Sequence, residues 1–511
     1  MDKLNFRARA FKNVGTTWFS LGVNVVVSII LTPLILHRLG DEGYGLWALV
    51  FSFAGYFNIF DFGLRSAVIR YVSRFYAKRD YEQLARYVNT ILFIFNCITV
   101  FLVVATIGAS WYVTSIFRIS PGLHHTARLL FLIVGCSFAL QFPGEVFVGV
   151  LGGIQEFWWE NWVKVIAGVL RLVLILIVLD HGLGLLSISI VAVGLSLASY
   201  VSYILIALRR LPLRFVPRFS DFTTLKEILS YSTTTFASIV AGGLTSTAGN
   251  TLIGIFLSAA AITPFAIAMK FVQYINRIIQ ASSQIFTPMS SHFDATGELG
   301  RLRRVFIVGN RACAFVAFPA CVGVLWLGKS AIEVWVGVKY GWCYGLLAIL
   351  IIPHTLQFAQ LASPKVLYGM ARHLTLGKAR LIEGAANIAL SIILLHYYGI
   401  WGVALGTAIP KFCASVFFLP AHLCHMLKVS IRTFLWEAYK WPLVACTPMA
   451  IVLYFMHRRA VPHHLLALVA QTVVASLVYA FTVFVYVLLK EPEGIKIRKR
   501  LLKPGSGILN R

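Results

Sequence analysis

The chain has 511 residues, of which 59% are hydrophobic and 13% are charged, and its mean hydropathy is +0.81. Water-soluble proteins carry about 25% charged residues, so this composition excludes soluble enzymes, secreted disulfide scaffolds and disordered chains. It predicts an all-α polytopic membrane protein. The net charge of +26 would suggest a nucleic-acid partner for a soluble chain. Here we interpret it as an insertion signal and expect no nucleic-acid partner.

Apolar segments long enough to span a bilayer, about 20 residues each, follow one another along the whole chain. We predict about fourteen, at 14–36, 43–64, 88–109, 126–152, 160–180, 183–207, 229–256, 259–285, 305–328, 342–368, 377–397, 399–424, 434–457 and 463–489. Lys and Arg concentrate in the N-terminus, the even-numbered loops and the tail, which predicts that both termini are cytoplasmic. The basic loops around Arg65–Arg86 and Arg209–Lys226 are expected to form amphipathic helices.

An internal repeat with a spacing of 218 residues relates the two halves of the chain. Its polar matches pair Thr16 with Thr234, Thr17 with Thr235, Ser20 with Ser238, Asn58 with Asn276, Ser73 with Ser291 and Arg86 with Arg304. Farther along, the offset slips to 216 at Gln141 and Gln357 and to 217 at Gly182 and Gly399. Each copy holds six predicted spans, so both copies insert in the same orientation and form parallel repeats.

The repeat predicts a domain organisation typical of a transporter. Residues 1–220 form an N-lobe and residues 221–430 a C-lobe, two parallel six-helix lobes around a central cleft. Residues 431–511 add two C-terminal helices and a basic tail. Such lobes can open the cleft to either side of the membrane in turn.

The eighth predicted span carries polar residues on one helical face. Lys270, Gln273, Arg277 and Gln280 are spaced 3, 4 and 3 residues apart, which places them in one stripe. We expect this stripe to line a water-filled lumen. The alternative is that the two cations extend to the membrane interfaces, but this would not explain the glutamines.

Two further cations lie deep within predicted spans, where charges are costly and mark pathways. Arg171 lies midway along the fifth span and Lys411 lies beside Pro410 in the twelfth. Each could bind substrate or form a structural ion pair, and Glu145 is a candidate partner for Arg171. The predicted substrate-binding set is therefore Lys270, Gln273, Arg277, Gln280, Lys411 and Arg171.

Two carboxylates within spans are candidates for coupling to an ion gradient. Glu145 follows Pro143 and Gly144 in the fourth span, and a carboxylate there could bind a proton or a cation; a charge-balancing role is the alternative. Asp61 precedes Arg65 by one turn, so a local ion pair is the favoured interpretation of Asp61. We expect no catalytic residues, metal site or cofactor, because nucleotide, zinc and nucleophile-elbow motifs do not occur in suitable contexts.

Residues Leu31–Leu84 carry the motifs of a known family. The LGDEGYGLW turn, the DFGL segment and the RYVSR segment resemble the bacterial polysaccharide transporter family, the flippases of lipid-linked O-antigen or capsule repeat units. That family belongs to the multidrug, oligosaccharidyl-lipid and polysaccharide exporter superfamily. The second copy of the repeat lacks the Tyr-Gly pair at Ala259–Phe265.

The resemblance implies a function in surface polysaccharide biosynthesis. The protein would move a polyprenyl-pyrophosphate-linked oligosaccharide from the cytoplasmic to the periplasmic leaflet of the bacterial inner membrane by alternating access. Its expected partners are the lipid-linked oligosaccharide on undecaprenyl pyrophosphate, membrane lipids, and polymerase and chain-length proteins. Alternatives are a multidrug or ion antiporter of the same superfamily, and a polyprenyl-dependent glycosyltransferase or polymerase, for which the chain lacks a sizeable periplasmic loop with clustered acidic residues.

Overall fold

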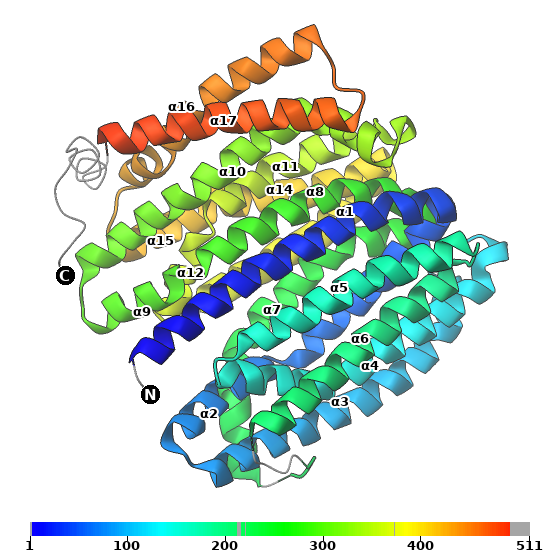
Figure 1. Ribbon diagram of the computed structural model, residues 1–511, viewed down its shortest axis with the longest axis vertical. Coiled ribbons are helices and arrows are strands. Elements are labelled where there is room, and N and C mark those ends of the chain that lie inside the picture. The colour runs from blue at the N-terminus through cyan, green and yellow to red at the C-terminus, as the bar shows by residue number, and fades with distance from the viewer. Residues whose placement is uncertain (1–2, 212–215, 220, 373, 491–511) are drawn as a thin grey trace. The chain divides into compact units, whose positions relative to one another are not determined.

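The computed structural model describes residues 3–211, 216–219, 221–372 and 374–490, and this part of the chain is helical and contains no strand (Figure 1). The all-α prediction is confirmed. The helices of the first half are α1 (Lys3–Gly55), α2 (Leu64–Lys78), α3 (Tyr81–Ile116), α4 (His124–Gly153), α5 (Phe157–Asp180), α6 (Leu185–Arg210), α7 (Phe222–Phe256) and α8 (Ala259–Ser283). Those of the second half are α9 (Phe286–Ala295), α10 (Leu299–Val336), α11 (Cys343–Ala359), α12 (Ala362–Gly369), α13 (Leu374–Tyr398), α14 (Ile400–Cys413), α15 (Leu419–Leu427), α16 (Ile431–Arg459) and α17 (Leu465–Lys490).

Helix α1 contains the first predicted span and most of the second. At Gly40 its backbone leaves the helical conformation, with φ 69° and ψ −178°, a region that favours glycine. The apolar stretch Lys12–Asp61 has 50 residues, or about 75 Å of helix at 1.5 Å per residue. This exceeds twice the hydrocarbon thickness of about 30 Å, so the stretch is long enough for one span on each side of the break at Gly40.

Length and hydropathy identify ten helices in the described residues that could cross a membrane, or eleven if α11 and α12, which are bent by 40° relative to each other, form one span. The count of ten treats the stretch Lys12–Asp61 as one helix. Helices α7 and α8 also occupy the seventh and eighth predicted positions. The chain is a multi-pass membrane protein, but a count of fourteen spans is not confirmed.

The backbone repeats at the offsets found in the sequence. Helices α3 and α10 begin 218 residues apart, directly after Asp80 and Glu298. Residues with positive φ recur in pairs at offsets of 218, 216 and 217, namely Arg79 and Gly297, Gln155 and Ala371, and Gly182 and Gly399. Because left-handed residues mark the ends of helices, this agreement means that both halves place their helix ends at corresponding positions.

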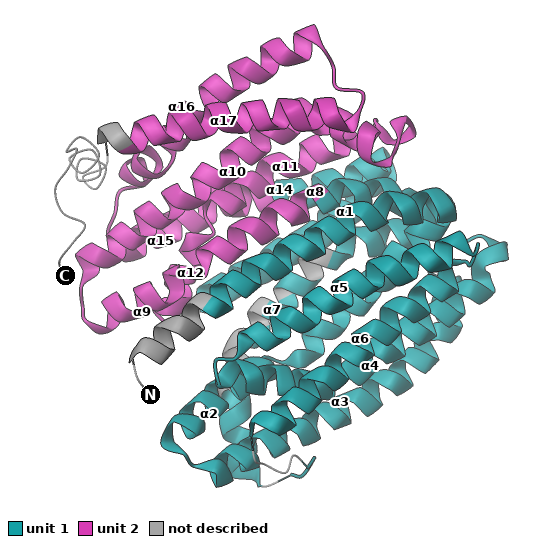
Figure 2. Cartoon of the chain, viewed as in Figure 1, with its two compact units in different colours: residues 1–270, 373–410 teal, residues 271–372, 411–511 magenta. Residues whose placement is uncertain are grey.

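Two compact units are distinguished within the chain (Figure 2). Unit 1 comprises residues 1–270 and 373–410, and unit 2 comprises residues 271–372 and 411–511. In unit 1, α13 packs against α7, α3 packs against α4, and α5 packs against α1 and α6. In unit 2, α10 packs against α11 and α16. The domain boundaries after residues 220 and 430 stay a prediction.

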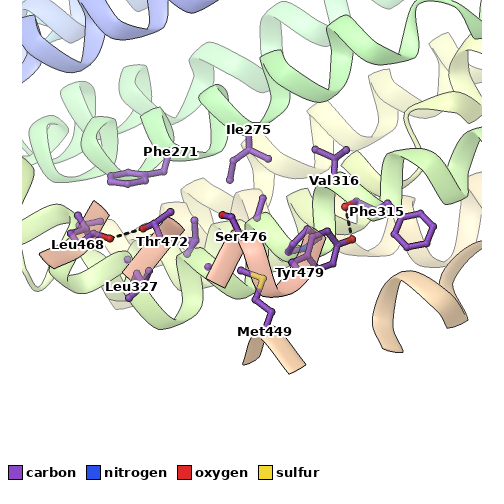
Figure 3. A pocket seen from close by; sticks show the side chains of 16 residues that line it. Phe271, Ile275, Phe315, Val316, Leu327, Met449, Leu468, Thr472, Ser476 and Tyr479 are labelled. Atoms are coloured by element: carbon purple, nitrogen blue, oxygen red, sulfur yellow. Dashed lines mark hydrogen bonds between the residues drawn. The ribbon is translucent and has the colours of Figure 1, made fainter. Parts of the chain in front are cut away.

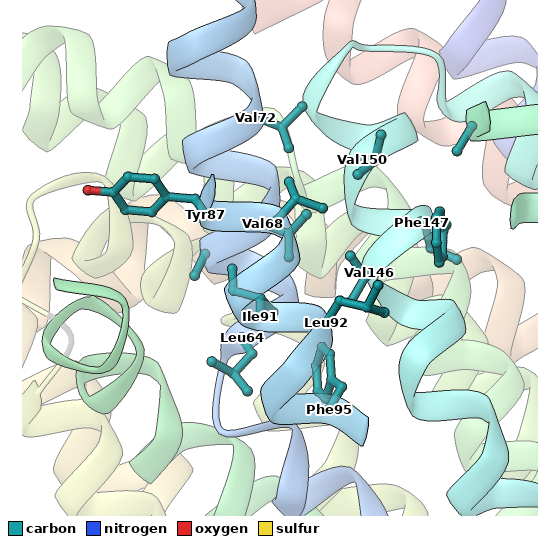
Figure 4. Close-up of a cluster of buried hydrophobic side chains, with 14 of the residues drawn as sticks. Leu64, Val68, Val72, Tyr87, Ile91, Leu92, Phe95, Val146, Phe147 and Val150 are labelled. Carbon is teal, nitrogen blue, oxygen red and sulfur yellow. The ribbon is translucent and has the colours of Figure 1, made fainter. Parts of the chain in front are cut away.

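Helix α2 is the amphipathic helix expected after Arg65. Its apolar face, including Leu64, Val68 and Val72, packs against α3 and α4 in a buried hydrophobic cluster (Figure 4). Its opposite face exposes Arg70 and Arg74. The second expected amphipathic helix, around 209–226, is not formed as a separate element in the described residues, because α6 ends at Arg210 and α7 begins at Phe222.

Gly45, the glycine of the Tyr-Gly pair in the first repeat, allows close packing of two helices. A Cβ at Gly45 would lie 1.8 Å from the carbonyl oxygen of Ala259, closer than any side chain allows. The absent side chain therefore lets α1 approach the beginning of α8 within unit 1.

Candidate functional site

A charged network in unit 1 surrounds the guanidinium group of Arg65. This group lies 3.1 Å from Oε2 of Glu145 and donates a hydrogen bond of 3.2 Å to Oε1 of Glu160. Lys164 donates a hydrogen bond of 2.6 Å to the same oxygen of Glu160. The turn before α2 positions Arg65, since Gly63 is left-handed with φ 79°. Arg65 thus joins carboxylates from α4 and α5.

Tyr200 of α6 completes the environment of Glu145. Its hydroxyl donates a hydrogen bond of 2.6 Å to Oε1 of Glu145. The neighbouring Gly144 makes room for the ring, because a Cβ at that position would lie 2.2 Å from Cδ1 of Tyr200. The glycine before the carboxylate therefore permits this hydrogen bond.

Two sequence-based pairings are wrong. Glu145 pairs with Arg65 rather than with Arg171, and Arg171 has no ionic partner in the described residues. Asp61 accepts a hydrogen bond of 3.2 Å from the backbone N–H of Arg65, but the Arg65 side chain turns to the two glutamates instead. Asp61 therefore terminates a short 3-10 helix (Tyr56–Asp61) next to the network and forms no side-chain ion pair with Arg65.

The network borders a cavity of about 200 Å³ in unit 1. Glu160, Lys164 and Arg171 lie along one face of α5 and line this cavity. Ser196, Tyr200 and Tyr203 line it from α6. Glu160, Lys164 and Tyr200 were not among the predicted site residues, although the spacing of four between Glu160 and Lys164 is a recognisable signal of one helical face.

The predicted polar stripe of α8 occupies one face of the helix, as its spacing requires. Gln273, Arg277 and Gln280 are exposed, whereas Val272 and Ile279 are buried. In unit 1, Lys270 donates a hydrogen bond of 2.5 Å to Thr32 and lies 5.7 Å from the ring centroid of Tyr44. Ile278, which follows Arg277, is also exposed, so the separation of polar and apolar faces is partial, and the lining of a lumen stays a prediction.

Lys411 lies in the interior of unit 2, where its exposed fraction is 4%. Its ammonium group lies 3.4 Å from Oε1 of Gln357. A π-helical segment, Ala414–Phe418, follows within one turn, and Gln360 donates a hydrogen bond of 2.7 Å to the backbone carbonyl of Ser415 in that segment. Segments of this kind often occur at functional sites.

A larger pocket of about 500 Å³ in unit 2 is mainly apolar (Figure 3). Its lining comes from α8, α10, α16 and α17 and includes Phe271, Ile275, Met449 and Leu468. The hydroxyl of Tyr479 donates a hydrogen bond of 2.7 Å to the backbone carbonyl of Phe315. The pocket therefore offers an apolar surface to a ligand. In the described residues, no group of three His, Cys, Asp or Glu side chains could hold a metal ion.

The fold resembles that of membrane transporters. The structure is similar to the inward closed conformation of the lipid II flippase MurJ, with a TM-score of 0.64 and 16% identity over 92% of this chain and 97% of that one. It is also similar to an inward-facing multidrug resistance MATE family transporter of the MOP superfamily, with a TM-score of 0.63 and 15% identity over 81% of this chain and 95% of that one.

Sequence comparison establishes the family. Residues 35–344 match the model of the polysaccharide biosynthesis protein family, and the chain belongs to that family. It is 20% identical to the uncharacterized membrane protein EpsK of Bacillus subtilis over 93% of this chain and 95% of that protein. It is 23% identical to the probable low-salt glycan biosynthesis flippase Agl15 of Haloferax volcanii over 53% of this chain and 57% of that protein.

A third relative, the putative O-antigen transporter of Shigella flexneri, is 23% identical over 29% of this chain and 34% of that protein. These findings confirm the resemblance drawn from Leu31–Leu84. They place the chain among polysaccharide biosynthesis proteins, and the flippases and transporters named among its relatives and structural neighbours are not enzymes.

Proposed function

We propose that the protein flips a polyprenyl-pyrophosphate-linked oligosaccharide from the cytoplasmic to the periplasmic leaflet of the bacterial inner membrane by alternating access. Both termini are cytoplasmic in this proposal, as the distribution of Lys and Arg favours. The observation that carries it is the exposed polar face of α8 with Gln273, Arg277 and Gln280, in a family of polysaccharide biosynthesis proteins. A polar face within an apolar chain requires a polar ligand or water.

The cations of the predicted set suit the pyrophosphate of such a substrate. Guanidinium and ammonium groups recognise phosphate oxygens through charge-assisted hydrogen bonds. Arg277 is exposed and forms no hydrogen bond in the described residues, so it is the first candidate for this contact. Lys270, Lys411 and Arg171 supply further positive charge, and the amides of Gln273 and Gln280 match sugar hydroxyls.

The apolar pocket of unit 2 suits the polyprenyl chain. Its lining by Phe271, Ile275, Met449 and Leu468 offers hydrocarbon contacts, and each buried methylene group contributes about 0.8 kcal/mol of transfer free energy. A pocket of about 500 Å³ holds only part of a long isoprenoid, so the remainder of the chain would stay in lipid.

Glu145 is the proposed coupling group. Protonation would remove its charge-assisted interaction with Arg65 and weaken its hydrogen bond from Tyr200, so the network on α2, α4 and α6 would rearrange. Asp61 lies next to this network and is the second candidate. Polymerase and chain-length proteins are the proposed protein partners.

A second candidate function is multidrug or ion antiport, which the structural similarity to the MATE transporter favours. Transport assays separate the two. A polysaccharide flippase restores surface polysaccharide in a flippase-deficient strain without changing drug susceptibility. A multidrug antiporter lowers drug susceptibility but does not restore surface polysaccharide.

The test of the proposed site is substitution of Arg277, Lys270 or Lys411 by Ala in that strain. Each variant should be produced at the wild-type level but lose surface polysaccharide, and lipid-linked oligosaccharide should accumulate on the cytoplasmic side. The matched control is Arg128→Ala, which removes an exposed cation of α4 bound to Thr114 outside these sites. Normal polymer in all three variants would refute the cationic binding site.

A further inference from the structure

The cavity of unit 1 contains a cation that its own carboxylates do not neutralise. Glu145 is paired with Arg65, and Glu160 is shared between Arg65 and Lys164. Arg171 lines the same cavity and forms neither a hydrogen bond nor an ion pair with any described residue. Among the residues that line the cavity, three cations therefore face two carboxylates, and Arg171 is the cation without a carboxylate partner.

The position of Arg171 makes this excess charge costly. It lies nine residues before the end of α5 at Asp180, about 14 Å along the helix axis. Its Nε atom is buried without an acceptor. A charge near the middle of a bilayer costs about 2.5 to 3.5 kcal/mol on insertion scales. A ligand that neutralises Arg171 would offset this cost, whereas water would leave the charge in place.

Two hydroxyl groups in the same cavity also lack partners. Ser196 and Tyr203 lie seven residues apart on α6, which places them on one helical face, and both line the cavity. In the described part of the chain neither hydroxyl forms a hydrogen bond, although Tyr203 is only 4% exposed. Nε of Arg171 is a buried donor without an acceptor, which is uncommon because buried donors normally find acceptors, and the two hydroxyls are free to bind a ligand in the cavity beside it.

The size of the cavity restricts the ligand that it can hold. Its volume of about 200 Å³ corresponds to roughly six or seven water molecules at 30 Å³ each, and pockets for drug-sized ligands begin at about 300 Å³. A guanidinium group binds carboxylate or phosphate through two parallel hydrogen bonds. We propose that this cavity is a binding site for a small oxyanion, a carboxylate or a phosphate group, held by Arg171 with Ser196 and Tyr203.

The proposal deepens the role of Arg171 in the proposed function, but its test is independent of transport. The purified full-length protein in detergent is titrated with inorganic phosphate or with glucuronate at constant ionic strength, with chloride as the balancing anion. The thermal unfolding midpoint should rise saturably, because a ligand that binds the folded state stabilises it. The variant R171Q should need at least about tenfold more ligand for the same rise, a loss of about 1.4 kcal/mol.

Conservative variants keep the test valid if R171Q does not fold. S196A and Y203F remove one donor each and should weaken binding by about three- to tenfold, whereas R128Q should bind as the wild type does. Saturation by phosphate identifies a free anion as the ligand, and saturation by glucuronate alone identifies a sugar carboxylate; both support the site. Absence of saturable stabilisation by either probe, or wild-type affinity in R171Q, would overturn the proposal while leaving the flippase function untouched.

Discussion

The packing of Tyr200 on Gly144 predicts that Gly144→Ala is destabilising in the middle of an apolar helix, where alanine is ordinarily favoured. The added Cβ would lie 2.2 Å from Cδ1 of Tyr200 and 2.8 Å from its Cγ, so the ring must move. Overpacking typically costs about 1 to 3 kcal/mol. Displacing the ring also breaks the bond of its hydroxyl to Glu145, and hydrogen bonds to charged groups contribute about 1.5 to 3 kcal/mol.

The assay is the unfolding free energy of the purified protein in detergent. We expect Gly144→Ala to lose about 2 to 4 kcal/mol, since strain and the lost hydrogen bond add only in part. The matched control is Gly194→Ala on α6, whose added Cβ would meet nothing within 4 Å. This control should be neutral or gain up to about 1 kcal/mol from helix propensity.

A double-mutant cycle isolates the clash. Tyr200→Ala removes the obstructing ring, so Gly144→Ala should have little additional effect in that background. The cycle should therefore give a coupling energy of about 2 to 4 kcal/mol, which is nearly the whole effect of Gly144→Ala. Equal destabilisation by Gly144→Ala with and without the Tyr200 ring would refute the packing argument.

Three other substitutions test separate contacts. Arg65→Gln should cost about 1 to 3 kcal/mol of unfolding free energy, because both of its glutamate partners lose a cation, and Arg65→Lys should restore part of the loss. Asn310→Ala should lower the unfolding free energy by about 1 to 3 kcal/mol, because the buried Ser363 hydroxyl, 2.9 Å from the Asn310 amide, loses its hydrogen-bond partner. An unfolding free energy equal to that of the wild type would contradict this expectation. The backbone N–H of Thr224 and the guanidinium of Arg86 lower the pKa of Asp221, which lies outside the spans, to about 2. The ionised carboxylate therefore stabilises the folded protein fully above the unfolded-state pKa of 3.8, and this stabilisation is lost as the pH falls towards 2. Asp221→Asn should remove this component of acid unfolding measured between pH 4 and pH 2, and an unchanged profile would refute the assignment.

The sequence was sufficient to predict features that depend on local periodicity. Helices lie at all the predicted span positions, because runs of about 20 apolar residues have few alternatives to a helix in lipid. The facial separation of Arg277 from Ile279 on α8 follows from 3.6 residues per turn. The offsets of the repeat were also readable, since they concern residue identities and not contacts.

Contacts between helices could not be predicted in the same way. Arg65 and Glu160 are 95 residues apart in the chain, and no periodicity relates them. The nearest carboxylate in sequence, Asp61, was therefore assigned to Arg65, although the fold brings Glu145 and Glu160 closer to its guanidinium. Unpaired Arg171 was recognisable as a buried charge, but the cavity that it lines required the arrangement of α4, α5 and α6.

The π-helical segment Ala414–Phe418 sets the rotational phase of the chain that follows Lys411. One residue more than an α-helical turn advances every later side chain by about 100° around the axis. With this advance in place, Leu423 and Leu427 of α15 are buried in the interior of unit 2. Shortening the segment by one residue would rotate those leucines by about 100° into the half-buried positions of His422 and Met426, so the wide turn couples the orientation of α15 to that of the buried lysine before it.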